Sequence, residues 1–134
     1  MKIAIEPSSR SEFERAVVAA GCEVAPLTPE VKALIWTDYS RPELLRETLD
    51  ANPQLEWVQL PFAGVDAFAD LLTRQPVFTS AKAAYSEPVA EHALALMLAL
   101  GRAIPERVRA KSWGEKFAVS LYESKVLVVG AGGI

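Results

Sequence analysis

Short apolar runs alternate with longer amphipathic segments through the first 80 residues of the chain. Five runs have the length and composition of buried strands: Lys2–Glu6, Cys22–Ala25, Ala33–Trp36, Leu55–Leu60 and Val77–Thr79. The segments between them predict a helix from Ser11, a loop at Pro26–Pro29, a helix up to about Ala51 and a short helix over Val65–Leu72. Because the strands are apolar on both faces, this alternation predicts a parallel α/β sheet covered by helices.

Two helix starts carry the pattern of a capping box, in which a serine and a glutamate three residues later satisfy free backbone amides. Ser11 with Glu14 is the first, and Ser40 with Glu43 is the second. Pro42 in the first turn strengthens the prediction that the second helix starts there. Proline has no backbone N–H, and an N–H in the first turn would have no partner within the helix.

The segment Ser86–Arg102 predicts a helix of a different kind, with Ser86 as its cap. From Val89 to Leu100 it is apolar almost all round, which a half-exposed surface helix is not. We expect it to be buried on several sides, between domains or between subunits. A more polar helix follows Pro105, and Lys125–Val129 predicts a last buried strand.

Charge and composition narrow the class of protein. The net charge of −3 argues against nucleic acid and against an anionic membrane surface as partners. The longest apolar run, residues 93–100, is far shorter than the roughly 20 residues that a membrane-spanning helix needs. Cys22 is the only cysteine, which excludes an intrachain disulfide and a thiolate-rich metal site. With no secretory signal visible, the sequence predicts a cytoplasmic α/β protein without a metal centre.

The glycines after the last predicted strand are a candidate cofactor site. In a dinucleotide fingerprint, glycines placed as Gly130, Gly132 and Gly133 form a tight turn and let the backbone approach a pyrophosphate. The preceding Val-Leu-Val-Val run is the context that this motif requires. An ordinary glycine turn after a strand is the alternative.

A second candidate is the loop Phe62–Asp66, at the carboxyl end of a predicted parallel strand, where ligands of open α/β sheets bind. Gly64 permits backbone conformations that direct amides toward an anion. Locally, a plain strand-to-helix turn capped by Asp66 explains the pattern better. Tyr85 offers a hydroxyl to a substrate, although a tyrosine before a helix is more often packed. His92, the sole histidine, lies within the apolar helix and is interpreted as a structural or interface residue.

Taken together, four segments resemble the D-isomer-specific 2-hydroxyacid dehydrogenases over nearly the whole chain. They are Trp57–Gln59, Ala63–Asp66, Ser86–Leu100 and Val126–Ile134. The resemblance implies a flavodoxin-like substrate-binding domain over 1–86 and an interdomain and dimerisation helix with its connector over 87–124. Residues 125–134 would then form the first strand and turn of an NAD-binding Rossmann domain, so that the chain is the N-terminal part of the enzyme.

The resemblance also implies a reaction and a set of site residues. The family transfers a hydride between NAD or NADP and C2 of a 2-hydroxy or 2-oxo acid. Ala63, Gly64 and Tyr85 match substrate-binding positions, and Gly130, Gly132, Gly133 and Ile134 match the cofactor-binding turn. The arginine, glutamate and histidine that catalyse the reaction match positions beyond Ile134, so no catalytic residue is expected among 1–134 and this piece alone is expected to be inactive. A homodimer through Ser86–Arg102 is expected.

Two other interpretations remain open. A stand-alone α/β module that binds carboxylates or dimerises, without catalysis, fits the same elements if the final strand finds a partner. Alternatively, the chain belongs to another family of dehydrogenases or hydrolases with a similar two-domain plan. The sequence does not identify the 2-hydroxy acid or discriminate NAD from NADP.

Overall fold

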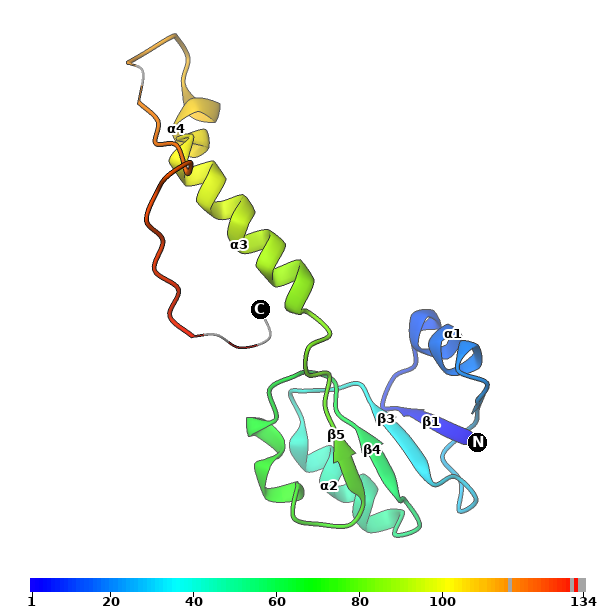
Figure 1. The fold of residues 1–134 in the computed structure, drawn as a ribbon. Helices are drawn as coiled ribbons and strands as arrows, with labels where there is room; N and C mark the ends of the chain where they lie inside the picture. The colour runs from blue at the N-terminus through cyan, green and yellow to red at the C-terminus, as the bar shows by residue number, and fades with distance from the viewer. Residues whose placement is uncertain (116, 131, 133–134) are drawn as a thin grey trace. The chain divides into compact units, whose positions relative to one another are not determined.

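A computed structural model describes residues 1–115, 117–130 and 132 of the chain (Figure 1). The chain forms two compact units, Met1–Lys82 and Ala83–Ile134. The predicted boundary at residue 86 lies close to the junction of these units. The further division into 87–124 and 125–134 stays a prediction.

The first unit is built on a five-stranded, all-parallel sheet. Its strands are β1 (Lys2–Glu6), β2 (Glu23–Val24), β3 (Ala33–Trp36), β4 (Trp57–Gln59) and β5 (Val77–Thr79), in the order β2-β1-β3-β4-β5. This is the strand order of flavodoxin-like folds, so the predicted fold class is confirmed. β2 and β4 are shorter than predicted. The strand pairing does not include Cys22, Ala25, Leu55 or Leu60, although Leu55 and Leu60 are still buried.

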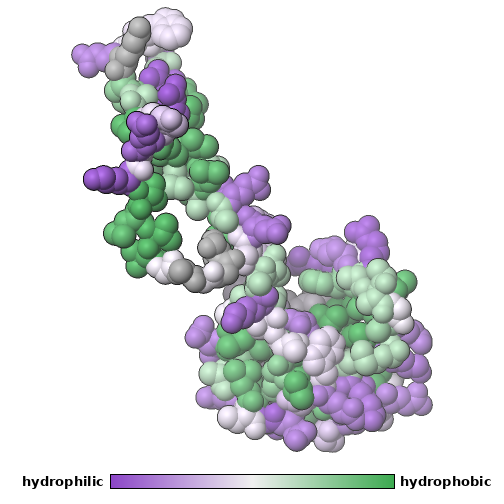
Figure 2. Space-filling view, in the orientation of Figure 1, coloured by the Kyte–Doolittle hydropathy of each residue, from purple (hydrophilic) through white to green (hydrophobic). Residues whose placement is uncertain are grey.

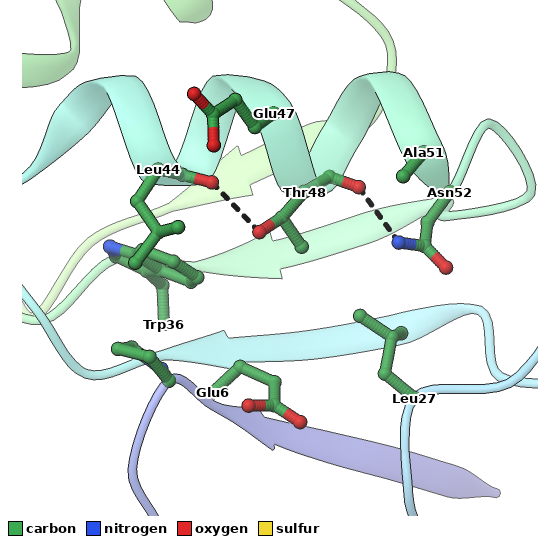
Figure 3. A pocket seen from close by; sticks show the side chains of 9 residues that line it. Glu6, Leu27, Trp36, Leu44, Glu47, Thr48, Ala51 and Asn52 are labelled. Carbon is green, nitrogen blue, oxygen red and sulfur yellow. Dashed lines mark hydrogen bonds between the residues drawn. The ribbon is translucent and has the colours of Figure 1, made fainter.

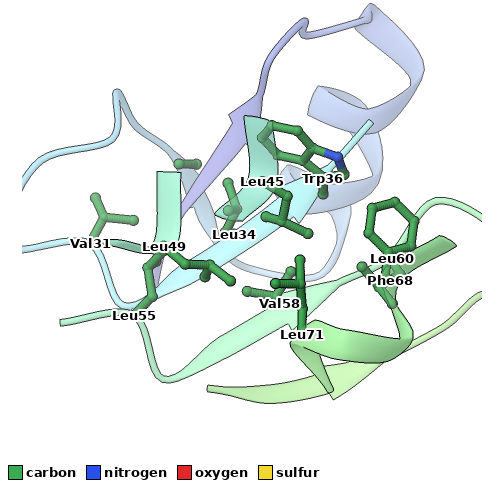
Figure 4. Close-up of a cluster of buried hydrophobic side chains, with 11 residues drawn as sticks. Val31, Leu34, Trp36, Leu45, Leu49, Leu55, Val58, Leu60, Phe68 and Leu71 are labelled. Atoms are coloured by element: carbon green, nitrogen blue, oxygen red, sulfur yellow. The ribbon is translucent and has the colours of Figure 1, made fainter. Parts of the chain in front are cut away.

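Three helical segments cover this sheet: α1 (Ser11–Ala19), α2 (Pro42–Ala51) and a 3-10 helix, η1 (Asp66–Leu71). Successive side chains of a strand point to opposite faces, so β1 and β3 contribute to two separate cores. Leu34 of β3 packs with Leu45 of α2 and Phe68 of η1 (Figure 4). On the other face, Ile3 and Val17 pack in a smaller cluster under α1. Each fully buried side chain of this kind stabilises the fold by roughly 1.5–3 kcal/mol.

Neither predicted capping box forms. Helix α1 already begins at Ser11, with Arg10 before it, and Glu14 accepts a hydrogen bond from Ser9 Oγ at 2.6 Å instead. Ser40 turns its hydroxyl to Asp38 Oδ1 at 2.7 Å, so that it does not cap α2. For Ser40, the Asp38 carboxylate is a stronger partner than a helix amide. In α1, Ser9 occupies the glutamate that the capping box would use. Pro42 does begin α2, as predicted.

The second unit contains α3 (Ser86–Gly101) and α4 (Ile104–Arg109). The predicted cap is wrong here too, because Ser86 is the first helical residue and no side chain caps the helix. No residue of α3 is buried within the described chain, and Figure 2 shows hydrophobic surface along it. Leu94, Leu98 and Leu100 are 50%, 47% and 69% exposed, respectively. Contiguous exposed apolar surface of this kind is typical of interaction sites.

The predicted strand over Lys125–Val129 is wrong for the described chain. Val126, Leu127, Val128 and Val129 have no strand conformation, and their side chains are 59–92% exposed. A parallel strand exists only through hydrogen bonds to a neighbour, and no described residue supplies that neighbour. None of the described helices has both the length and the apolar character needed to cross a membrane.

Candidate functional site

The loop that leaves β4 lies at the carboxyl edge of the parallel sheet. Phe62, Ala63 and Gly64 are all exposed there. Within the described part of the chain, neither the Ala63 nor the Gly64 amide donates a hydrogen bond. Two neighbouring backbone donors without a protein partner are what a carboxylate or another small anion can occupy.

Gly64 does not adopt the left-handed conformation that a backbone nest for an anion uses. Among the described glycines, only Gly21 and Gly130 have positive φ. A Cβ at position 64 would meet only Asp66 Oδ2, at an ordinary 3.6 Å. Gly64 therefore forms no left-handed backbone nest, contrary to the expectation from its glycine freedom. The feature that remains is the pair of Ala63 and Gly64 amides, which have no hydrogen-bond partner among the described residues.

An aromatic pair stands beside these amides. Tyr39, in the loop after β3, contacts Phe62 in an edge-to-face arrangement with ring centroids 5.3 Å apart. The rings are 61% and 43% exposed, so they leave apolar surface next to Ala63. The sequence pattern gives no sign of Tyr39 at this site, because no local motif joins two loops that are separated by a helix and a strand.

Thr37 fixes the relation between the loops that follow β1 and β3. Its amide donates to the carbonyl oxygen of Glu6 at 2.7 Å. Its hydroxyl lies 3.1 Å from that oxygen and 2.9 Å from the carbonyl oxygen of Ser8, and it accepts the Ser8 amide at 3.3 Å. These bonds hold two of the loops that form the carboxyl edge of the sheet.

Asp38 is the one described group of this edge whose pKa is clearly displaced. The Ser40 hydroxyl, then the Ser40 amide and Arg41, lower its pKa from 3.8 to about 2. Arg41 Nε donates to Asp38 Oδ2 at 2.6 Å, so the guanidinium is already paired. Hydrogen bonds to the ionised carboxylate favour that form, which keeps Asp38 charged at neutral pH.

The remaining predicted site residues lie in the second unit. Tyr85 precedes α3 and is 57% exposed. His92 is exposed on α3. Gly130 has a φ of 98°, a value that glycine adopts easily and that suits a tight turn. Gly133 and Ile134 lie outside the described residues.

A dinucleotide requires a strand, a glycine turn and a following helix whose N-terminus faces the pyrophosphate. Of these, residues 125–130 and 132 supply only the turn at Gly130. The described residues thus do not by themselves fit a bound dinucleotide. Over the same residues, no group of three His, Cys, Asp or Glu side chains is placed to hold a metal ion.

Comparison with known proteins supports the fold. No family model matches the chain, and no curated protein matches it. A solved structure, the TT0316 protein from Thermus thermophilus, is 19% identical with a TM-score of 0.58, over 90% of this chain and 46% of that one. A phosphoglycerate dehydrogenase from Lactobacillus plantarum is also 19% identical, over 90% of this chain and 43% of that one, with a TM-score of 0.43. The chain spans less than half the length of both, and at this identity the likeness to TT0316 establishes a shared α/β fold.

Proposed function

We propose that this chain is the substrate-binding part of an NAD(P)-dependent D-2-hydroxyacid dehydrogenase. The observation that carries the proposal is the pair of free amides of Ala63 and Gly64, exposed after β4 at the carboxyl edge of a flavodoxin-like sheet. Ligands of open parallel sheets bind at this edge. The likeness in fold to a longer protein and the ordered motifs of the sequence support the same proposal.

In the proposed reaction, the amides of Ala63 and Gly64 hold the carboxylate of a 2-oxo acid and orient its C2 carbonyl. NAD(P)H would supply a hydride to C2, and a proton taken up by the C2 oxygen completes the 2-hydroxy acid. The cofactor assignment rests on the glycine pattern from Gly130, and Tyr85 is proposed as a further substrate contact. The single cysteine favours the reducing cytoplasm as the compartment.

Helix α3 is the proposed dimer contact. Its exposed leucines form an apolar surface, and burying such a surface is favourable. A second copy of the same helix would cover it. Leu100→Lys should shift the chain toward the monomer in sedimentation, since a charge at this contact has no partner. Val18→Lys, at a similarly exposed position on α1, is the matched control and should leave the mass distribution unchanged. A monomeric unsubstituted chain would refute the contact.

The substrate site is tested by titrating the 134-residue chain with 2-oxobutyrate and following its backbone amides by NMR. The signals of Ala63 and Gly64 should move in a saturable way. 2-Oxobutyramide has the same shape without the charge, and it should bind at least about tenfold more weakly, because charge-assisted hydrogen bonds are about twice as strong as neutral ones. Equal binding of the two ligands, or shifts confined to other residues, would contradict the site.

The activity is tested on the full gene product, with NADH and NADPH and a panel of 2-oxo acids. The product should oxidise one cofactor with a D-2-hydroxy acid as product, whereas residues 1–134 alone should show no turnover. A non-catalytic carboxylate-binding module is the second candidate. It is favoured because all five strands of the sheet lie within the compact unit Met1–Lys82. Carboxylate binding without cofactor oxidation by the full product would support that candidate.

A further inference from the structure

A cavity of about 410 Å³ opens in the first unit between β1, β3 and α2 (Figure 3). Its walls include the apolar side chains of Leu27, Trp36 and Leu44, and Glu6 brings a carboxylate to it. Glu47 lies at its rim on α2, with its carboxylate directed away from Glu6 (Figure 3). The volume is within the range of small-molecule sites, which is about 300–1,000 Å³. The cavity is distinct from the Ala63–Gly64 loop, so it does not depend on the proposed function.

The topology of the sheet explains why a cavity forms here. β1 leads into α1 on one face, whereas β3 leads into α2 on the other, so their carboxyl ends diverge. In the order β2-β1-β3-β4-β5, the carboxyl ends of β1 and β3 flank the switch point at which open α/β sheets bind ligands. The cavity begins there, at Glu6 and Trp36, and extends along α2 to Asn52. The connection from β2 to β3 is a loop rather than a helix, and Leu27 of that loop fills only part of the space beside α2.

The polar groups of the cavity favour a cation over an anion. The Thr48 hydroxyl already donates to the Leu44 carbonyl at 2.8 Å, and the Asn52 amide nitrogen donates to the Thr48 carbonyl at 2.8 Å (Figure 3). No Lys, Arg or His lines the cavity. A bound anion would therefore meet the Glu6 carboxylate and find no free charged donor.

Glu6 and Glu47 are without partners over the described residues. Neither side chain takes part in an ion pair or a hydrogen bond there, while five other acidic residues of the unit are paired with lysine or arginine. Glu6 is only partly exposed. A carboxylate in partial contact with apolar walls gains from a cation that is held beside it.

We propose that this cavity binds a small organic cation, namely a primary ammonium group carried on a short aliphatic body. The ammonium contacts the Glu6 carboxylate, and the aliphatic body lies against Leu27 and Leu44, over the buried Trp36 ring. The Trp36 ring is buried, and its indole nitrogen has no hydrogen-bond partner over the described residues, so it reports on the site through its N–H signal.

The test is a titration of the whole 134-residue chain with butylammonium, 1-butanol and butyrate, followed through the Trp36 indole N–H signal. Butylammonium should give a saturable shift, and the two ligands without a positive charge should bind about two- to fivefold more weakly, which is the size of a partly exposed charge interaction. The amides of Ala63 and Gly64 should not move, which separates this site from the carboxylate site.

Glu6→Gln keeps the shape of the side chain and removes its charge, so butylammonium should bind about fivefold more weakly to this variant. Glu43→Gln is the matched control, because Glu43 also lies on α2 but does not line the cavity. Amide spectra of both variants verify the fold. Binding of 1-butanol as tight as that of butylammonium, an unchanged affinity in Glu6→Gln, or no saturable shift would each overturn the proposal.

Discussion

The Tyr39 ring meets the Phe62 ring edge-on, at a centroid distance of 5.3 Å and an interplanar angle of 65°. This contact joins the loop after β3 to the loop after β4, directly beside the free amides of Ala63 and Gly64. An edge-to-face pair of this kind contributes about 0.5–1.5 kcal/mol, and less where both rings are exposed, as they are here.

Phe62→Ala should therefore free the β4 loop with little effect on global stability. We expect faster hydrogen exchange at the Ala81 amide, which donates to the Phe62 carbonyl at 3.1 Å, and a loss of less than about 1 kcal/mol in the free energy of unfolding. Phe13→Ala, on α1, removes a comparably exposed ring and should leave exchange at Ala81 unchanged. Unaltered exchange at Ala81 in Phe62→Ala would show that the pair does not order the loop.

Thr37→Val should destabilise the first unit. The change removes a part-buried hydroxyl that bonds to the Ser8 amide and to the carbonyl oxygens of Glu6 and Ser8, at a cost of about 1–3 kcal/mol. Urea unfolding measures this difference. Thr28→Val is the control, since Thr28 is exposed and its hydroxyl makes no hydrogen bond to a described residue. Equal midpoints for the two variants would contradict the role of Thr37.

The Asp38 carboxyl should titrate near pH 2, because hydrogen bonds from Ser40 and the charge of Arg41 lower its pKa from 3.8. Since the folded pKa lies below the unfolded one, the stabilisation from this group is complete above about pH 4. It is lost as the pH falls from 3.8 through about 2. Carboxyl-carbon NMR measures the midpoint, and Ser40→Ala should raise it. A midpoint near 3.8 in the unsubstituted chain would count against the network.

Gly101→Ala should displace the connector in the second unit. A Cβ at position 101 would lie 2.9 Å from the Val119 carbonyl oxygen, which is too close. Because this oxygen belongs to the backbone, it cannot move aside as a flexible side chain could. The hydrogen bond from the Val119 amide to the Gly101 carbonyl, 2.7 Å long, should then open. Hydrogen exchange at Val119 should accelerate. Gly114→Ala meets no atom within 4 Å and should leave this exchange unchanged; protection retained in Gly101→Ala would disprove the contact.

Leu45→Ala should cost about 2–5 kcal/mol in the free energy of unfolding. Leu45 is fully buried between α2 and the sheet, so truncation leaves a cavity in addition to the lost transfer energy. Val18→Ala, on the exposed side of α1, should change stability by less than about 0.5 kcal/mol. Chemical denaturation of both variants checks the contrast, and a loss below about 1 kcal/mol for Leu45→Ala would mean that this core is loosely packed.

The local pattern predicted correctly the strands whose neighbours also lie within the described chain. The bounds of β1, β3 and β5 follow from the sequence, because buried parallel strands are short apolar runs. The predicted capping boxes do not form because each one loses a member to a residue outside its four-residue motif. Ser9 donates a hydrogen bond to Glu14, and Ser40 donates one to Asp38. The strand over residues 126–129 failed because a strand, unlike a helix, needs a neighbour.

The sequence alone determined the α/β class, the parallel sheet and the position of the Phe62–Asp66 loop at its carboxyl edge, since these follow from apolar periodicity and element order. The tertiary structure decided which loops meet there. It placed Tyr39 on Phe62 and Thr37 on Ser8, left the amides of Ala63 and Gly64 free, and opened the cavity between Glu6 and α2. The reason is physical: contacts between residues about 20–30 positions apart depend on strand order and helix packing, which no local pattern encodes.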